Sequence, residues 1–272
     1  MEVRRLVDAD QGRVDALLSA DPVANCFLVS RVAAHGVNRC GGDMWGAFRR
    51  GRLRGLVYLG ANVVPAGEVD AMPSLAAQLG RGPRRGEAIV GPSRAVAPLW
   101  AGLREHWGPP RDERPCQPLM LADQVPQVLP DPGVRLASAA DLDALFEPSV
   151  DMFTEEVGRS PLLSSSESAY RARLAWLIRA RRLFCRIEGA QVVFKSELAV
   201  VGRAVGQVQG VWVAPELRGR GISAGAMVAT TVLAREIVDK VSLYVNDFNT
   251  PALRAYRRAG FRQVGEMASI QF

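Results

Sequence analysis

A strand that passes through a glycine-containing turn into a helix constrains the fold of this 272-residue chain most strongly. The apolar strand Gly206–Val213 is followed by Pro215, which cannot continue it, and a helix is predicted to begin near Gly221. The apolar residues of that helix recur every three or four positions and are Ile222, Ala226, Ala229, Leu233 and Ile237. A strand joined directly to a helix is a building unit of α/β domains.

The turn Arg218–Ser223 has the composition of an anion site. The first turn of a helix has free backbone N–H groups and the positive end of the helix dipole. Gly219 and Gly221 let an anion approach these amides closely, and Arg218 and Arg220 add positive charge. We therefore expect a bound pyrophosphate here, with an ordinary glycine-rich loop as the alternative. The order Arg-x-x-Gly-x-Ser is neither a Walker A loop nor a Rossmann fingerprint.

The segment 124–133 contains three prolines and a glycine, which disfavour both helix and central strand. It is predicted to be a linker between a first domain, residues 1–123, and a second domain, residues 134–272. Each domain opens with a short strand and an acid-capped helix, and later has a hairpin, with turns at Arg50-Gly51 and Glu188-Gly189. A true internal repeat and two unrelated α/β domains both account for this pattern.

The charge of the chain is spread evenly. Residues 1–130 hold 16 Arg and Lys against 13 Asp and Glu, and residues 131–272 hold 18 against 15, within a net charge of +6. A nucleic-acid-binding protein usually concentrates its charge on one face or segment, so no nucleic-acid partner is expected. The densest cluster, Arg49–Arg54, predicts a hairpin with a solvated face. A modestly basic surface also suits an anionic small ligand.

Cysteine and histidine are too few and too scattered for a zinc site or a Cys–His nucleophile, so no metal is expected. The cysteines are Cys26, Cys40, Cys116 and Cys185, and the histidines are His35 and His106. The cysteines are expected to be buried thiols in a reducing cytoplasm. The first residues lack the apolar core of a signal peptide, and no apolar run has membrane-spanning length. We expect a soluble, cytoplasmic protein without a membrane partner.

The stretch Val211–Ser223 resembles the acetyl-CoA signature of the GCN5-related N-acetyltransferase (GNAT) superfamily. The family pattern is Gln/Arg-x-x-Gly-x-Gly/Ala, and Ser223 departs from it only at the last position. Serine is small and keeps its amide, so the departure is compatible with the same role.

A second motif follows in the order typical of that family. Asn246, Asn249 and Tyr256 precede Gly260-Phe261, similar to the family's Asn, short helix with a Tyr, and Gly-Phe. Asn249 or Thr250 is expected to cap the short helix, and Gly260 to end it in the left-handed conformation. The resemblance covers roughly residues 134–272.

The resemblance implies an α/β (α+β) GNAT fold, with a mixed, mostly antiparallel sheet in which two parallel strands splay apart. Those strands correspond to Val208–Val213 and Val241–Val245, and acetyl-CoA would lie between them. The first half resembles the degenerate GNAT-like domain that precedes such a domain in some bacterial proteins. It would supply a wall or docking surface, not a second active site.

The resemblance also implies the cofactor-binding residues. The backbone of Val211 and Val213 would pair with the pantetheine arm, and the Val211 amide would face the oxyanion. The amides of Arg218 to Ser223 would hold the pyrophosphate, and Asn246 or Asn249 would bind pantetheine or brace the strands. The full set is Val211, Trp212, Val213, Arg218, Gly219, Arg220, Gly221, Ile222, Ser223, Asn246 and Asn249.

The implied reaction is transfer of an acetyl group from acetyl-CoA to an amine of an unidentified small-molecule, peptide or protein acceptor. Tyr256 would protonate the departing thiolate, the alternative being a buried aromatic. Many relatives carry a glutamate where this chain has Gln207 and Gln209.

Glu155 and Glu156 are therefore the preferred general-base candidates, the alternative being a solvated helix end, and Glu197 is a weaker one. A non-catalytic acyl-CoA-binding module and a transferase using another acyl-CoA stay open, and the oligomeric state is not predicted.

Overall fold

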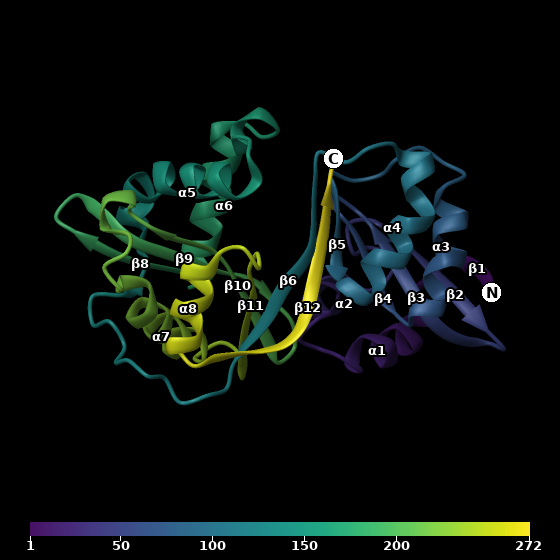
Figure 1. The fold of residues 1–272 in the computed structure, drawn as a ribbon, viewed down its shortest axis with the longest axis horizontal. Helices are drawn as coiled ribbons and strands as arrows, with labels where there is room; N and C mark the ends of the chain where they lie inside the picture. Colours follow the sequence, from purple (N-terminus) through teal and green to yellow (C-terminus); the bar gives the residue numbers. More distant parts are fainter. The chain divides into compact units, whose positions relative to one another are not determined.

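Internal contacts divide the chain into two units in the computed structural model, which describes residues 1–272 (Figure 1). Unit one consists of Met1–Leu119, Tyr244–Phe248 and Gln263–Phe272, and unit two consists of Met120–Leu243 and Asn249–Arg262. The final residues of the chain thus group with unit one, although they follow unit two in sequence.

Unit one is an α/β structure with a mixed sheet. Its strands β1 to β4 pair antiparallel in sequence order, β4 pairs parallel with β5, and β5 pairs antiparallel with β12. Its elements are β1 (Glu2–Arg5), η1 (Asp8–Asp10), α1 (Gln11–Ser19), α2 (Cys26–His35), β2 (Asp43–Arg49), β3 (Arg52–Leu59), β4 (Val63–Gly67), η2 (Val69–Ala71), α3 (Met72–Leu79), β5 (Ala88–Pro92), α4 (Ser93–Trp107), β6 (Asp112–Ala122) and β12 (Phe261–Gln271).

The hairpin predicted at Arg50-Gly51 is confirmed as β2 and β3. Both turn residues have positive φ, 51° and 75°, which matches the right-handed twist of the two strands. Helices α3 and α4 pack one apolar face on the sheet around Leu75, Leu99 and Leu103, which are fully buried. Apolar residues of α1 and α2 contribute to a second cluster that includes Leu56 and Tyr58.

Unit two repeats this architecture. Strand β10 pairs antiparallel with β9 and parallel with β11, and β9, β8 and β7 pair antiparallel in turn. Its elements are β7 (Arg135–Leu136), η3 (Ala139–Asp141), α5 (Leu142–Val157), η4 (Pro161–Leu163), α6 (Glu167–Arg179), β8 (Leu183–Glu188), β9 (Gln191–Val201), β10 (Val205–Val213), η5 (Pro215–Leu217), α7 (Ile222–Ala234), β11 (Lys240–Tyr244) and α8 (Thr250–Arg258). The predicted mixed sheet and α/β class are confirmed.

From β1 to α4 in unit one and from β7 to α8 in unit two, the order of elements is the same, apart from the short η4. Each opens with an arginine on the first strand that binds an aspartate six residues later through two hydrogen bonds, Arg4–Asp10 at 2.7 Å and Arg135–Asp141 at 2.8 and 2.9 Å. Each aspartate also accepts a hydrogen bond from the backbone N–H that precedes the helical turn. The same device at the same place in both units favours an internal repeat over two unrelated domains.

Two details of the helices differ from the sequence expectation. Helix α7 ends at Ala234, so Ile237 lies outside it and is 37% exposed. Residues outside the predicted stripe, such as Ala224 and Thr230, are buried as well. None of the helices combines the length and the hydropathy that a bilayer-spanning segment requires.

The proline-rich segment 124–133 contains no helix or strand. Its backbone is nevertheless bonded within unit two: Gln124 donates to the carbonyl of Gly260, Gln127 to that of Arg258, and Asp131 to that of Gly225, at 2.8–3.0 Å. The segment therefore packs along α7 and α8.

Candidate functional site

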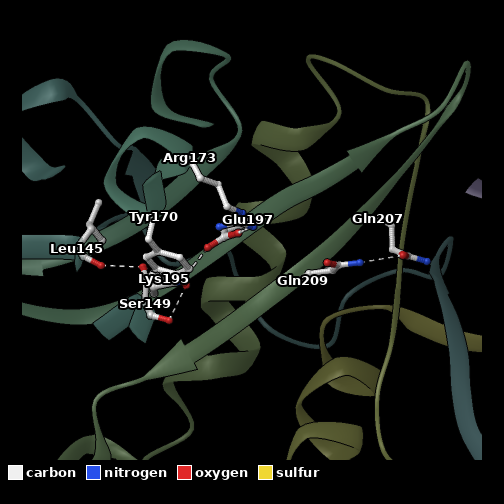
Figure 2. Close-up of polar contacts among 8 residues, drawn as sticks. All are labelled: Leu145, Ser149, Tyr170, Arg173, Lys195, Glu197, Gln207 and Gln209. Carbon is white, nitrogen blue, oxygen red and sulfur yellow. Dashed lines mark hydrogen bonds and ion pairs between the residues drawn. The ribbon is translucent and has the colours of Figure 1, made fainter. Parts of the chain in front are cut away.

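The two parallel strands of unit two part soon after they begin. Their register covers Val205↔Lys240, Gly206↔Val241 and Gln207↔Ser242 and ends there, while β10 continues to Val213. The side-chain amide of Gln209 bonds to that of Gln207 at 3.2 Å, at the point of separation (Figure 2). The predicted splaying of the strands is confirmed.

A β-bulge bends β10 at this point. The register with β9 jumps from Gln209↔Glu197 to Trp212↔Lys195, so two residues of β10 lie opposite one residue of β9. Gly210, the first of the two, has φ +60°. A Cβ added there would lie 3.0 Å from the methyl carbon of Met152 and 3.4 Å from the carboxyl carbon of Glu197. Only glycine suits both the conformation and the space.

A buried ionic network lies beside the bulge. Figure 2 shows the Glu197 carboxylate between Lys195 Nζ, at 2.9 Å, and the Arg173 guanidinium, at 2.6 Å. Lys195 also donates to Ser149 Oγ at 3.0 Å, and Lys195 and Glu197 are 0% and 1% exposed. Burial acts to raise the pKa of Glu197, but the two cations outweigh it, so the pKa lies below its usual value. The network therefore favours the ionised form of Glu197, whose carboxyl group lies beside Gly210.

The predicted anion turn has the expected backbone geometry. Gly219 and Gly221 have φ of +77° and +81°, and Gly221 is the N-cap of α7. The N–H groups of residues 219–223 donate to no backbone carbonyl, whereas that of Arg218 donates to Pro215 at 3.2 Å. A Cβ at either glycine would meet nothing within 4 Å, so conformation and not crowding demands glycine. Five amides, not the six predicted, remain for an anion.

The two arginines of the turn differ in their partners. The Arg218 guanidinium donates to both carboxylate oxygens of Glu155, at 2.9 and 3.0 Å, and to the carbonyl oxygen of Val213, at 3.0 Å. Arg220 is exposed and has no such partner, so its charge is the one available to a ligand. Glu155 lies in the last turn of α5, because that helix continues to Val157 and ends at Gly158 in the left-handed conformation.

Helix α8 begins and ends as predicted. The Asn249 side chain accepts a hydrogen bond from the amide of Ala252 at 3.2 Å, and Gly260 has φ +89°. Tyr256 on this helix is 7% exposed, its hydroxyl bonds to no protein group, and its ring packs on that of Phe261. Burial, and then the charge of Glu156, raise the pKa of Tyr256 above its usual value. The phenol therefore keeps its proton at neutral pH and can donate it.

Two predicted site residues have other surroundings. Asn246 groups with unit one, where its side-chain oxygen accepts a hydrogen bond from Gln117 at 2.8 Å. The Trp212 side chain is part of the core of unit two, so only its backbone can contact a ligand in the opening. Val211 and Val213, on the opposite face of β10, are half-buried.

Sequence reasoning missed Gly210, Lys195 and Arg173. An isolated glycine within an apolar strand is a signal for a bulge, and Gly210 carried that signal. Lys195 is one of only two lysines in the chain, but its full burial cannot be read from its neighbours in sequence.

Comparisons with known families divide the chain in two. Residues 42–145 match a domain of unknown function (DUF4081), and residues 153–261 match the acetyltransferase (GNAT) family. No curated protein sequence matches the chain.

Solved structures share the fold over the whole chain at low sequence identity. A GCN5-related N-acetyltransferase from Sphaerobacter thermophilus has a TM-score of 0.63 and 16% identity, covering 99% of this chain and 95% of its own. A GNAT-family acetyltransferase from Colwellia psychrerythraea has a TM-score of 0.59 and 13% identity, covering 100% of both chains. A tandem GNAT protein from the clavulanic acid biosynthesis pathway has a TM-score of 0.51 and 13% identity, covering 99% and 98%.

Proposed function

We propose, from the premise that residues 153–261 belong to the acetyltransferase (GNAT) family, that the protein transfers an acetyl group from acetyl-CoA to the nitrogen of an amine. Acyl transfer from acetyl-CoA follows from the family. We add to this that the acceptor is an amine, and we assign roles to the residues that act on it.

The observation that carries the proposal is the set of unbonded amides at residues 219–223, at the end of a strand that has parted from its neighbour. A diphosphate brings several oxygens and negative charge to one place. Free N–H groups at a helix N-terminus bind such a group through both hydrogen bonds and the helix dipole. Arg220 adds a positive charge without a competing carboxylate.

The exposed backbone of β10 is proposed to take the pantetheine arm as an added strand. Beyond Gln207 the strand has no partner on the β11 side, so the backbone groups of Val211 and Val213 on that edge are available. The bulge at Gly210 redirects the Val211 amide, which we assign to the carbonyl oxygen of the thioester. That amide would stabilise the oxyanion that forms there.

In the reaction the amine nitrogen attacks the thioester carbon, a C–N bond forms and the C–S bond breaks. Tyr256, which is protonated at neutral pH, gives its proton to the departing thiolate. The bound geometry supplies the rest of the acceleration by holding the two reacting groups together.

We assign Glu156 as acceptor of the amine proton, because its charge acts on Tyr256. Glu155 is bound to Arg218, and Glu197 is held by two cations, so both are weakened as bases. Glu156 interacts electrostatically with Tyr256, which connects it to the same reaction centre.

Binding is tested by the melting temperature of the protein with acetyl-CoA. A ligand at about 100 times its Kd stabilises by about 2.7 kcal/mol, which raises the Tm by about 5–10 °C for a chain of this size. Gly221→Ala and Arg220→Glu should remove most of this shift. Gly189→Ala is the matched control, because Gly189 also has positive φ, +58°, and no neighbour within 4 Å. An unchanged Tm in wild-type protein at millimolar acetyl-CoA would refute the proposal.

Catalysis is tested separately by thiol release from acetyl-CoA with a panel of primary amines. Tyr256→Phe should lower kcat by about 10²–10⁴-fold and leave the acetyl-CoA-dependent Tm shift intact. Gln207 and Gln209, in place of an acid, favour the alternative of an acyl-CoA-binding module without turnover. A full Tm shift without thiol release for any amine would select that alternative.

The proposal includes a cytoplasmic location. All four cysteines are free and three of them are buried, as suits a reducing compartment.

A further inference from the structure

Unit one has a cavity of about 640 Å³ that the proposed function does not use. It is bounded by α1, by β3, by Gly67 at the end of β4 and by Arg94 at the start of α4. Gly67 and Arg94 mark the carboxyl ends of the parallel strands β4 and β5. Ligands of α/β sheets bind at such ends, and the volume falls in the range of small-molecule sites.

The lining combines an apolar wall with arginines. Ala16 and Leu17 of α1 and Leu53 of β3 supply the apolar surface. Four arginines from three elements also line the cavity: Arg13, Arg52, Arg54 and Arg94.

Three of the four arginines have a carboxylate partner and one has none. Arg13 Nη1 lies 3.1 Å from Asp10 Oδ1, and Arg94 Nη2 lies 3.5 Å from Asp21 Oδ2. The Arg54 guanidinium is bound to the Glu68 carboxylate. No ion pair or hydrogen bond engages the guanidinium of Arg52. Nε of Arg54 is in addition buried without an acceptor. The cavity therefore holds more cationic donor capacity than its own carboxylates use.

A second cavity of about 590 Å³ continues this arrangement and is lined by arginines alone, Arg49, Arg50, Arg52 and Arg54. The sequence had predicted a solvated face for this cluster. The hairpin instead gathers these four arginines around a concave surface, where a β-bulge at Arg54 interrupts the alternation of side chains along β3. Arg50 at the turn has no carboxylate partner, while Arg49 lies 3.1 Å from Asp70.

The first cavity, beside α1, is not built for the diphosphate of CoA. In the repeated element order, the segment after β4 corresponds to the anion turn after β10. It reads Glu68-Val69-Asp70-Ala71-Met72-Pro73, with two carboxylates, no glycine and a proline that lacks an N–H. Such a turn repels a diphosphate and offers it fewer amides. The cationic groups lie on α1, β3 and α4 instead.

We propose that unit one binds a small organic anion, an apolar body that carries a phosphate or carboxylate group. The oxyanion lies between Arg52 and Arg54, whose planar guanidinium groups match the two oxygens of either group. The apolar body lies against Leu17 and Leu53. The proposal does not depend on acyl transfer by unit two.

The test uses phenyl phosphate as the probe, with benzoate and inorganic phosphate as further arms, and measures binding to the full chain by ligand-observed NMR. Phenyl phosphate should bind saturably and inorganic phosphate more weakly, because phosphate alone leaves the apolar wall uncovered. Whichever of phenyl phosphate and benzoate binds more tightly identifies the preferred oxyanion.

Arg52→Glu should weaken phenyl phosphate binding at least about tenfold, since a charge-assisted donor is replaced by a repelling charge. The matched control Arg81→Glu makes the same charge change at an exposed position outside both cavities and should bind like wild type. Circular dichroism and the Tm establish that both variants fold.

Arg220→Glu separates this site from the anion turn of unit two. Phenyl phosphate binding that survives Arg220→Glu and is lost in Arg52→Glu supports the proposal. Binding equal in Arg52→Glu and wild type, or lost only in Arg220→Glu, overturns it. The acetyl-CoA-dependent Tm shift should be unchanged in Arg52→Glu, so failure of either proposal is visible without the other.

Discussion

Replacing Gly210 by alanine tests whether the β10 bulge depends on its glycine. The residue has φ +60°, in the left-handed region that side chains with a Cβ disfavour. Its missing Cβ faces the methyl carbon of Met152 at 3.0 Å and the carboxylate of Glu197 at 3.4 Å. Alanine must therefore accept both an unfavourable backbone conformation and a close contact.

The two costs can be separated. The left-handed conformation costs about 1–2 kcal/mol for a residue with a Cβ. The contact at 3.0 Å requires Met152 to shift, which costs about 0.5–1.5 kcal/mol if it leaves its preferred rotamer. Gly189→Ala incurs only the first cost, because Gly189 has φ +58° and no atom within 4 Å of its virtual Cβ.

Thermal unfolding followed by circular dichroism measures both variants against wild type. At about 2–4 °C per kcal/mol, Gly189→Ala should lower the Tm by about 2–8 °C, and Gly210→Ala by a few degrees more. Gly210→Ala should also reduce thiol release from acetyl-CoA, while Gly189→Ala should not. Equal Tm losses together with equal activity would refute the reasoning that the bulge is tightly packed and functionally placed.

Two further predictions concern buried and partly exposed charges. Lys195→Met should lower the free energy of unfolding of unit two by about 3–5 kcal/mol in urea, because it leaves Glu197 buried with one cation fewer. The double variant Lys195→Met, Glu197→Leu should recover part of that loss. If the double variant recovers none of it, Lys195 and Glu197 do not form a buried ion pair. The Cys116 thiol donates a hydrogen bond to Glu266 Oε2 at 3.1 Å. This hydrogen bond, together with burial, raises the pKa of the thiol to about 11, so iodoacetamide should label Cys116 slowly at pH 8. Glu266→Gln should accelerate labelling about tenfold by mass spectrometry, and equal rates would show that the carboxylate does not hold the proton.

Local patterns in the sequence were sufficient for much of unit two. The strand–turn–helix at residues 206–234, the hairpin at Gly189 and the capped helix between Asn249 and Gly260 all follow from residues within a few positions of one another. A proline or a glycine restricts or frees its own φ angle, so its effect appears wherever it occurs in the chain.

The partners of the charged groups could not be obtained in the same way. Glu155 was a candidate base by composition, but Arg218, 63 positions later, binds it. Lys195 and Arg173 surround Glu197 because a helix and a strand meet there. These pairings weaken Glu155 and Glu197 as bases.

The amino-acid sequence by itself determined the turn that presents five unbonded amides, because glycine conformation and helix N-termini are local properties of the backbone. Only the tertiary structure decided that β10 bulges at Gly210 and that the arginines of the first hairpin line a cavity. It also decided that the final strand pairs with β5 of unit one. Such features depend on side chains that meet across long stretches of chain, and their free energy comes from contacts that no short segment contains.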